Sequence, residues 1–483
     1  MSTSSQKLSV GEKIGYSLGD LAANLVFQTL VTYLAYFYTD IYGLNTADSS
    51  IIILSVGLIA AFAFNPLIGA IADRTRSRWG KFRPWILLTA VPLGVVSLLA
   101  FSTPDFAYKG KVIYATITYT LLLLLYAANN LPYSALSGVI TGDMKERNSV
   151  SSYRFVAVMF AQFFVQVFMY PLILKVGDGD KAVGIEKLMT YLAIFGTVML
   201  LITFFTTKER IIPKKEQTSS VLDDLKDLMR NKPWVIILST TFLIFITLAM
   251  KGGSYVYYFE NYVDRNALAQ FLEPLLLGLA SIGFDFFGDD PVSAGFGLFN
   301  AGGIIFMIVG ITLSKGLADK YGKRDVFSSA LFASTLFILF FIFFPKDAVG
   351  LMFGSQILHG FFYGLTIPLL WAMIADVADY SEWKNNRRAT AIIFSAMMVG
   401  LKGGLSTGSA LLTSILGLYN YVPVEAIGAD FTGQPDSAIA GTRMLVSIYP
   451  SIPFFLCIAL LFFYEINKKM EVQIENDLKE RRA

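Results

Sequence analysis

Apolar stretches long enough to cross a bilayer recur along almost the whole chain. A spanning helix needs about 20 mostly apolar residues, and the 483-residue sequence holds twelve such stretches. They lie near residues 16–43, 49–72, 84–103, 112–140, 154–174, 188–206, 234–262, 294–314, 326–345, 349–375, 390–418 and 444–466. Hydrophobic residues make up 55% of the chain and charged residues only 16%, too few to cover an aqueous surface. The pattern predicts an all-α integral membrane protein with 12 transmembrane helices, for which the lipid bilayer is a partner.

Composition and motifs exclude several classes of function. The single cysteine, Cys457, cannot form a disulfide framework or a thiolate metal cluster. The sequence has no nucleotide-binding loop of the G-x-x-x-x-G-K-[ST] form, no metal-ligand cluster, and no nucleophile with a nearby base. We therefore expect neither an enzyme nor a metal protein, no nucleic-acid partner, and no cofactor except Na⁺ or H⁺ as a coupling ion. Secondary transport by a monomer fits best.

The distribution of basic residues predicts the orientation. With twelve spans the two termini share one side, and that side carries 29 of the 39 Lys and Arg residues, against 8 on the other. Cytoplasmic loops are the ones enriched in Lys and Arg, so both termini should be cytoplasmic in a plasma (inner) membrane. The segment before the first span is short and polar and lacks the pattern of a cleaved signal. We expect the first span to stay in the mature protein.

A short motif occurs twice, half a chain length apart. Gly-Ala-Ile-Ala-Asp-Arg stands at 69–74, and a similar Gly-Leu-Ala-Asp-Lys stands at 316–320, with a Gly-Lys pair following each. Internal duplication explains this, and many transporters are built from repeated halves. We expect six-helix halves at 1–206 and 234–466, a cytoplasmic linker at 207–233 and a cytoplasmic tail at 467–483.

Two connecting segments have features of their own. In the linker, Val221–Met229 is amphipathic and fits an interfacial helix, although we favour a solvated linker without a role. The outer loop at 263–293 holds an apolar, helix-compatible run, Leu268–Leu279, followed by three aspartates. This run fits an interfacial or re-entrant cap. A thirteenth span is disfavoured, because the run is short and would place the basic C-terminal tail outside.

Polar residues within the spans are the candidates for chemistry, since charge in hydrocarbon is costly and tends to line a cavity or find a partner. They are Asp20, Asn24, Asn129, Asn130, Arg154, Lys251, Glu260, His359 and Lys402. We interpret Lys402, which precedes two glycines, as a cavity residue. Lys251 and Glu260 fit a cavity role, helix locking or snorkelling. His359, the only histidine, would suit proton coupling, but a hydrogen-bonded interior role is favoured.

Tyrosines are abundant in the first and fourth spans, and Tyr126 is among them. Aromatic faces stack on the C–H faces of sugars, so these rings are candidates for sugar contact. Packing or an interfacial belt explains most of them equally simply.

Four strings of the sequence are characteristic: Ala-Asp-Arg-Thr-Arg-Ser-Arg-Trp-Gly-Lys-Phe-Arg-Pro-Trp at 72–85, Phe-Tyr-Thr-Asp at 37–40, Ala-Asp-Val-Ala-Asp-Tyr-Ser-Glu-Trp-Lys at 375–384 and Lys-Gly-Gly at 402–404. They resemble motifs of the glycoside-pentoside-hexuronide:cation symporters, the melibiose permease group of the major facilitator superfamily. The resemblance covers nearly the whole chain. It implies the major facilitator fold and cation-driven uptake of a sugar, glycoside or hexuronide. It also places sugar contacts on Asn24, Asn130 and Arg154, and a cavity lysine on Lys402.

The second span departs from the family pattern. Where the family has an aspartate pair spaced i and i+4 that holds the coupling ion, this chain has Ala61 and Asn65. Three interpretations follow. The ion site has moved, with Asp20 the candidate proton carrier; or the protein is an uncoupled facilitator or exchanger; or the cavity, which keeps Arg154 and Lys402, accepts an anionic sugar such as a uronide. The candidates for ion coupling are therefore Asp20, Asn65 and His359.

The cytoplasmic loops are expected to form a gate in an alternating-access cycle. Carboxylates near helix ends and nearby arginines are expected to bridge helices in the outward-facing state. The candidate gate residues are Asp73, Arg74, Arg78, Asp319, Asp376 and Asp379. A non-transporting membrane receptor is a rival function that the missing aspartates favour slightly, whereas drug or lipid export is disfavoured by the loop motifs.

Overall fold

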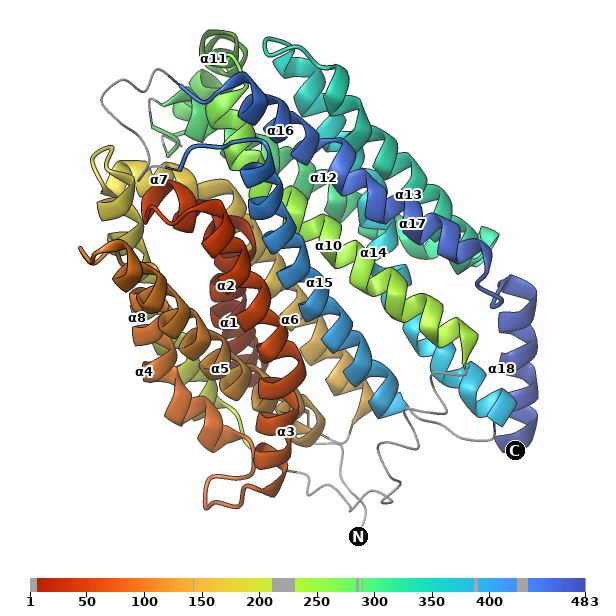
Figure 1. Ribbon diagram of the computed structural model, residues 1–483. Coiled ribbons are helices and arrows are strands. Elements are labelled where there is room, and N and C mark those ends of the chain that lie inside the picture. Colours follow the sequence, from red (N-terminus) through yellow and green to blue (C-terminus); the bar gives the residue numbers. More distant parts are fainter. Residues whose placement is uncertain are drawn as a thin grey trace. The chain divides into compact units, whose positions relative to one another are not determined.

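The computed structural model describes residues 7–141, 143–210, 231–283, 286–288, 290–385, 390–423 and 433–482. Every regular element in these ranges is a helix (Figure 1). Among the described residues, eleven helical segments are long and apolar enough to cross a membrane. The twelfth long helix is α15 (Thr390–Leu418), which carries Lys402, several glycines and several hydroxyl side chains. The predicted all-α architecture with twelve spans is confirmed.

The chain forms two compact units. The first comprises Met1–Glu216 with the short segments Phe286–Gly297 and Val422–Phe431, and the second comprises Gln217–Asp285, Leu298–Tyr421 and Thr432–Ala483. Each unit buries its own set of helix faces, so each positions its own polar side chains.

The first unit contains six spans, several of them built from consecutive helical pieces. They are α1 (Val10–Tyr36) with η1 (Phe37–Ile41); α2 (Thr46–Ile59) with η2 (Ala60–Phe64) and α3 (Asn65–Arg74); α4 (Arg83–Ala100); α5 (Tyr108–Ile140); α6 (Met144–Phe163) with η3 (Phe164–Phe168) and α7 (Met169–Val176); and α8 (Lys181–Thr206). Helix α1 packs against α6 and α8, and α4 packs against α5 and α8. The faces of α1, α5 and α6 therefore come close to one another.

The second unit has the same order of long helices, with two shorter ones added among its described residues, one after its first span and one after its last. Its elements are α10 (Lys232–Asn261), α11 (Arg265–Ser281), most of α12 (Pro291–Tyr321), α13 (Lys323–Leu339) with η4 (Phe340–Phe343), α14 (Val349–Asn385), α15, α16 (Asp436–Val446), α17 (Ile448–Phe462) and α18 (Lys468–Arg482). Helix α10 packs along α15 and α17, and α13 packs along α14. Helix α18 lies beside the end of α14 (Figure 1).

Short polar residues cap the first turns of several helices. The Ser9 hydroxyl accepts a hydrogen bond from the Glu12 N–H at 3.1 Å, and the Asn45 side chain accepts one from the Asp48 N–H at 2.7 Å. Asn231 caps α10 in the same way. Such caps satisfy N–H groups that have no partner within the helix. They fix where each span begins.

Three spans of the first unit contain a π-helical turn, at η1, η2 and η3. The turn η2 ends directly before Asn65 and Pro66, and its Asn65 N–H bonds to the Ala60 carbonyl. A π-turn accommodates an extra residue, and such turns occur frequently at functional sites. Here it lies at the position where the family's coupling aspartates are missing.

Helices α10 and α15 approach closely because α15 presents glycine to α10. A Cβ atom on Gly404 would lie 2.4 Å from the Phe242 carbonyl oxygen, and one on Gly408 would lie 2.3 Å from the Ile246 carbonyl oxygen. Small residues permit such close backbone contact between membrane helices. Substituting either glycine would push the two helices apart.

Several predicted boundaries are wrong. The fifth and sixth spans begin near residues 144 and 181 rather than 154 and 188, α14 continues to Asn385, and the last span is α16 and α17, from Asp436 to Phe462. Hydropathy detects only the part of a helix within hydrocarbon, whereas these helices continue into polar regions.

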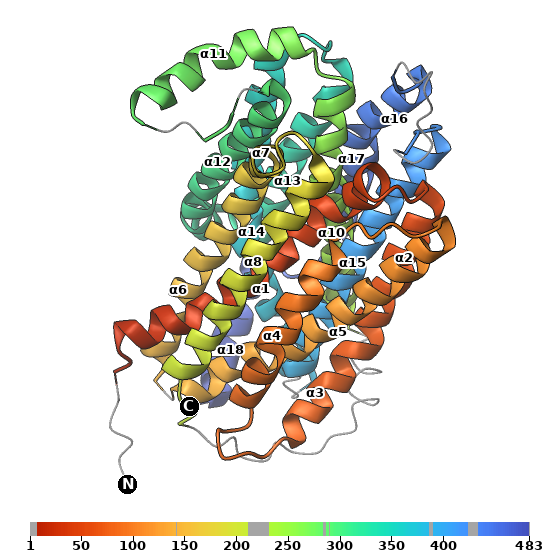
Figure 2. The same ribbon diagram turned by 90° about the vertical axis from the view of Figure 1, so that its left-hand side faces the viewer.

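The outer-loop helix is confirmed. The run Leu268–Leu279 lies within α11, which has 17 residues and is not among the eleven candidate spans. Figure 2 shows α11 running across the direction of neighbouring helices of its own unit. Of the aspartates that follow, Asp285 and Asp289 lie outside the described residues, as does Val221–Met229 of the linker.

Candidate functional site

An ion pair between α1 and α6 forms the centre of a polar cluster in the first unit. Arg154 Nε lies 2.8 Å from Asp20 Oδ2. Asn24, one turn along α1, donates from Nδ2 to the Asp20 backbone carbonyl at 2.9 Å and to Asp20 Oδ1 at 3.3 Å. Asp20 is buried, whereas Asn24 and Arg154 are partly exposed. Asp20 thus orients the two side chains that were predicted to contact a sugar.

The aromatic rings of Tyr16 and Tyr133 lie next to the Arg154 guanidinium. The rings of Tyr16 and Tyr133 stack with centroids 4.7 Å apart. Each hydroxyl donates to the other's backbone carbonyl, Tyr16 to Tyr133 at 3.0 Å and Tyr133 to Tyr16 at 2.8 Å. The Arg154 guanidinium lies 5.6 Å and 5.4 Å from the two ring centroids. This is a distance at which cation–π attraction acts, so the pair joins α1 to α5 and restricts the arginine.

Helix α5 contributes two asparagines with different surroundings. Asn129 is buried, and its amide donates to the Thr89 hydroxyl of α4 at 2.8 Å. Asn130 is partly exposed, and none of the hydrogen bonds among the described residues uses its amide. Tyr126, one turn before Asn130, is also partly exposed and stacks on Phe27 with centroids 6.3 Å apart. Residues at i and i+4 share a helix face, so Tyr126 and Asn130 lie together.

Four predicted sugar-contact residues therefore belong to one unit. Asn24, Tyr126, Asn130 and Arg154 come from adjacent helices α1, α5 and α6, and all four are partly exposed. They offer amide donors and acceptors, a guanidinium fork and an aromatic face, a set suited to hydroxyl groups. The fifth, Lys402, lies on α15 in the second unit and is also partly exposed.

The candidates for ion coupling lie in three different places. Ala61 is fully buried in η2, and Asn65 is partly buried at the start of α3. Asp20 is engaged with Arg154. His359 is buried on α14, where Nδ1 lies 2.8 Å from the Ser334 hydroxyl and the ring stacks on Tyr363. The favoured interpretation of His359 as a hydrogen-bonded interior residue agrees with this environment.

The buried lysine of α10 is not a snorkelling residue. Lys251 is only 7% exposed, and its Nζ donates to Gln356 Oε1 of α14 at 3.2 Å. The same oxygen accepts the Tyr255 hydroxyl at 3.1 Å. Lys251 therefore links two helices within the second unit.

The first loop motif is held by a glutamate that sequence reasoning missed. Glu209, just after α8, accepts hydrogen bonds from the backbone N–H groups of Lys81, Phe82 and Arg83 at 2.8, 2.7 and 2.9 Å. Gly80 has φ +109, and a Cβ there would lie 2.4 Å from the Glu209 carboxyl carbon. Position 80 therefore requires glycine, both because φ is positive and because a Cβ atom would clash with Glu209. No motif marks this glutamate, which is more than 120 residues from the loop.

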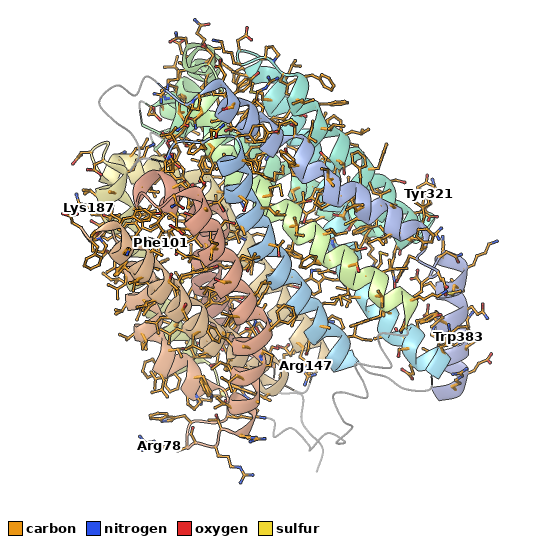
Figure 3. All side chains as sticks on the ribbon, viewed as in Figure 1. Arg78, Phe101, Arg147, Lys187, Tyr321 and Trp383 are labelled. Atoms are coloured by element: carbon orange, nitrogen blue, oxygen red, sulfur yellow. The ribbon has the colours of Figure 1, made fainter. Side chains whose placement is uncertain are left out.

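Of the other gate candidates in this loop, Arg74 and Arg78 are exposed, and Figure 3 shows Arg78 in the α3–α4 loop. The side chain of Asp73 lies outside the described part of the chain.

The second loop motif is held by a lysine from the C-terminal tail. Lys468 Nζ donates to the backbone carbonyls of Asp319 and Lys320 at 2.8 and 2.9 Å, and Gly322 (φ +96) lies against the Lys468 Cβ. The Asp319 side chain itself is exposed. A charged side chain therefore binds the backbone of the loop in each half. In the first half the Glu209 carboxylate accepts from backbone N–H groups, and in the second half the Lys468 ammonium donates to backbone carbonyls.

The remaining gate candidates lie on α14. Asp376 accepts from Lys323 Nζ at 2.7 and 2.8 Å, and the same Nζ lies 2.7 Å from Glu471 of α18. Asp379, one turn further, is partly buried. Trp383, at the end of α14 (Figure 3), donates from Nε1 to Asp477 at 2.7 Å. Among the gate carboxylates, Asp376 is therefore tied through Lys323 to α13 and α18 of its own unit.

Comparisons with known proteins agree with this architecture. The sequence pattern of the MFS/sugar transport protein family matches residues 15–468. The inner membrane symporter YicJ of Escherichia coli K12 is 36% identical over 455 residues, covering 94% of this chain and 91% of that protein. The isoprimeverose transporter of Lactiplantibacillus pentosus is 28% identical over 481 residues, covering 98% and 92%. Among solved structures, the nucleoside transporter NupG has the same fold, with a TM-score of 0.56 and 15% identity, covering 93% and 98%.

Proposed function

The chain belongs to the MFS/sugar transport protein family, and we propose that it imports a small sugar or glycoside by alternating access, coupled to a proton. The observation that carries the proposal is the cluster on α1, α5 and α6. Its partly exposed Asn24, Asn130 and Arg154 are polar groups at membrane depth, oriented by a buried carboxylate. A membrane receptor or scaffold would gain nothing from so costly an arrangement.

The charge of this cluster favours a neutral glycoside over a uronide. Arg154 is one of the two positive charges on which the anionic-sugar interpretation rests, and Asp20 offsets it at 2.8 Å. A bound carboxylate would have to compete with Asp20 for the guanidinium. Hydroxyl groups need no such competition, because they can accept from the unused guanidinium N–H groups and pair with the amides.

A proton fits the coupling role better than sodium. Sodium is a hard cation that prefers anionic oxygen ligands, and the usual site holds Ala61 and Asn65 instead. A proton needs only one titratable group. Among the described residues, no group of three or more His, Cys, Asp or Glu side chains is placed to hold a metal ion. Uncoupled exchange is the alternative.

We also propose the orientation and the state of assembly. Both tails are taken to be cytoplasmic in the plasma (inner) membrane, because 29 of 39 basic residues lie on their side. The transporter is taken to act as a monomer, because Asn24, Tyr126, Asn130 and Arg154 all come from one six-span unit and need no second chain to form the cluster.

Flux measurements in proteoliposomes test the function. Purified protein is reconstituted, and uptake of labelled isoprimeverose and of a labelled glucuronide is measured with an imposed proton gradient, an imposed sodium gradient or neither. We expect concentrative uptake of the neutral disaccharide under the proton gradient, and loss of uptake in Asn130→Leu. Uptake of the glucuronide alone would overturn the substrate class. Equilibrating flux without accumulation would support the uncoupled alternative, and binding without flux would support a receptor.

A further inference from the structure

Lys251 is a buried amine whose neighbours are uncharged. Its Nζ has one hydrogen-bond acceptor, Gln356 Oε1, and lies 4.9 Å from the Tyr255 ring centroid. Gln356 is itself buried and also accepts the Tyr255 hydroxyl. An ammonium carries three N–H donors, of which the described residues satisfy one. The described residues therefore provide fewer hydrogen-bond acceptors than a permanently charged ammonium has N–H donors.

Among the described residues of the second unit, carboxylates are distant from this amine along its own helix and along α14. On α10 the nearest is Glu260, nine residues away, or about 14 Å at the rise of an α-helix. Asp347, just before α14, is nine residues from Gln356, or about 14 Å, and Asp376 on α14 is 20 residues beyond Gln356, or about 30 Å. Lys323 in the same unit shows the contrast, because it contacts both Asp376 and Glu471. No such carboxylate contacts Lys251 among the described residues.

The other titratable groups on helices packed against α10 do not supply a counter-charge. Besides Asp376, Asp379, Tyr380, Glu382 and Lys384 at the far end of α14, they are His359 and Tyr363 on α14, Lys402 on α15, Asp436 and Arg443 on α16, and Tyr449 and Cys457 on α17. The carboxylate of α16, Asp436, begins that helix nine residues before Leu445, whose carbonyl accepts the Ser254 hydroxyl of α10, so it lies about 14 Å along α16 from this contact. Of the positively charged groups, Arg443 donates a hydrogen bond to the Ile342 carbonyl near the end of α10. Lys402 directly precedes Gly403, the glycine of α15 that faces the Phe242 side chain of α10.

His359 is the titratable group closest in sequence to the lysine's partner. It lies three residues after Gln356 on α14, hence on the same helix face, and its ring is held by Ser334 and Tyr363. An ammonium at Lys251 would have no stabilising charge nearby, and burial of an unpaired charge is costly. The neutral amine fits the same position, because it can still donate to Gln356.

We propose that Lys251 is the residue that binds and releases the coupled proton. The inference rests on the proposed sugar transport and names the coupling group, in place of Asp20, whose protonation would remove the charge that holds Arg154. The step is a simple acid–base exchange: the amine takes one proton from outside water, and the ammonium returns it to cytoplasmic water. Gln356 and Tyr255 position the amine in both forms.

The test separates sugar exchange from proton movement. Purified protein in proteoliposomes that contain a pH-sensitive dye is given isoprimeverose, and counterflow of labelled sugar is measured beside lumen acidification. In Lys251→Met we expect counterflow within about twofold of wild type, and acidification and accumulation reduced about tenfold or more. Lys346→Met, on an exposed outer loop, is the matched control and should change neither.

Each outcome decides the assignment. Acidification that persists in Lys251→Met overturns it, and loss of counterflow in a folded, inserted variant would assign Lys251 to sugar binding instead. Wild type that moves neither sugar nor protons would overturn the proposed function rather than this residue.

A second variant decides the matter if Lys251→Met fails to fold. Gln356→Glu places a carboxylate beside the amine and should hold the proton on it. The pH at which accumulation is half-maximal should then rise by about one unit or more, since one pH unit corresponds to a tenfold change in proton affinity. Gln356→Met, which adds no charge, should not raise it. An unchanged pH profile in Gln356→Glu would overturn the assignment.

Discussion

At the scale of the residue, Arg154 is held from two directions at once. Asp20 fixes its Nε, and the stacked rings of Tyr16 and Tyr133 lie beside the guanidinium plane. Only part of the fork is occupied, so the remaining N–H groups are available to a sugar. The arrangement leaves the arginine pre-oriented, which lowers the entropy lost on binding.

Substituting the two partners separately should distinguish charge from orientation. Asp20→Asn leaves Arg154 without its counter-ion, and we expect loss of about 3 kcal/mol of stability together with transport. Arg154→Lys keeps the charge but loses the planar fork, so sugar affinity should fall about tenfold or more while the unfolding temperature changes little. Thermal unfolding in detergent and sugar binding measure the two effects. Equal losses of stability in both variants would contradict this division.

Neighbouring asparagines on α5 provide a second pair with opposite expectations. Asn129→Ala removes a buried hydrogen bond to Thr89, and should cost about 1–2 kcal/mol of stability. Asn130→Leu should leave stability nearly unchanged and abolish sugar binding, because its amide is partly exposed and is proposed to bind the substrate. Each variant is the control for the other in thermal unfolding and binding assays. Retained sugar binding in Asn130→Leu would remove this residue from the site.

The sequence was enough to identify the polar residues within the spans, but not the residues with which they form hydrogen bonds and ring contacts. Asn24, Asn130 and Arg154 could be named because a polar side chain in an apolar run is conspicuous. The stacking of Tyr16 on Tyr133 and the hydrogen bond between Lys251 and Gln356 could not be predicted. In each case the two residues are more than 100 positions apart in the sequence and meet only in the folded structure. Hydropathy likewise located every span but missed helix ends outside the hydrocarbon.

At the scale of the element, the loop that carries the repeated motif is bound in each unit by a charged side chain that follows the last span of that unit. Glu209 follows α8 and binds three N–H groups at the start of α4, where the helix dipole favours a negative charge. Lys468 follows α17 and binds carbonyls near the end of α12, where the dipole favours a positive charge. The two loops are thus bound by side chains of opposite charge, Glu209 in the first unit and Lys468 in the second.

Removing the Glu209 carboxylate should destabilise the first unit. Glu209→Ala leaves three backbone donors without their charged acceptor, and we expect a loss of about 1–3 kcal/mol. Glu186, an exposed glutamate on α8, is the matched control, and Glu186→Ala should have little effect. Thermal unfolding in detergent measures both variants. Equal unfolding temperatures in the two would show that the Glu209 carboxylate contributes nothing.

Glu209 and Lys468 should contribute independently. Lys468→Ala should cost about 1–2 kcal/mol through its two carbonyl bonds. Because Glu209 and Lys468 share no partner, the double variant should lose the sum of the single losses within about 0.5 kcal/mol. A coupling energy well above this, measured by a double-mutant cycle in detergent, would mean that the two loops do not respond separately.

At the scale of the whole molecule, the proposed coupling ion rests on which carboxylates the spans retain. The structure places Ala61 in a buried π-turn and Asn65 at the next helix start, so these two positions offer no anionic oxygen. Asp20, the buried carboxylate at the centre of the cluster in the first unit, is held by Arg154, while Lys251 in the second unit has no carboxylate partner among the described residues. These features support our proposal of a proton, rather than sodium, as the driving ion.

Uptake should therefore be independent of sodium. At a fixed inward proton gradient, replacing sodium with choline on both sides should leave sugar accumulation unchanged, because Ala61 and Asn65 cannot supply the anionic ligands that sodium prefers. Collapsing the proton gradient with an ionophore should abolish accumulation but leave counterflow, since counterflow needs only the sugar site. Empty liposomes control for leak. Sodium-stimulated accumulation in wild type would show that a sodium site persists elsewhere in the fold, and would remove the argument from the missing carboxylates.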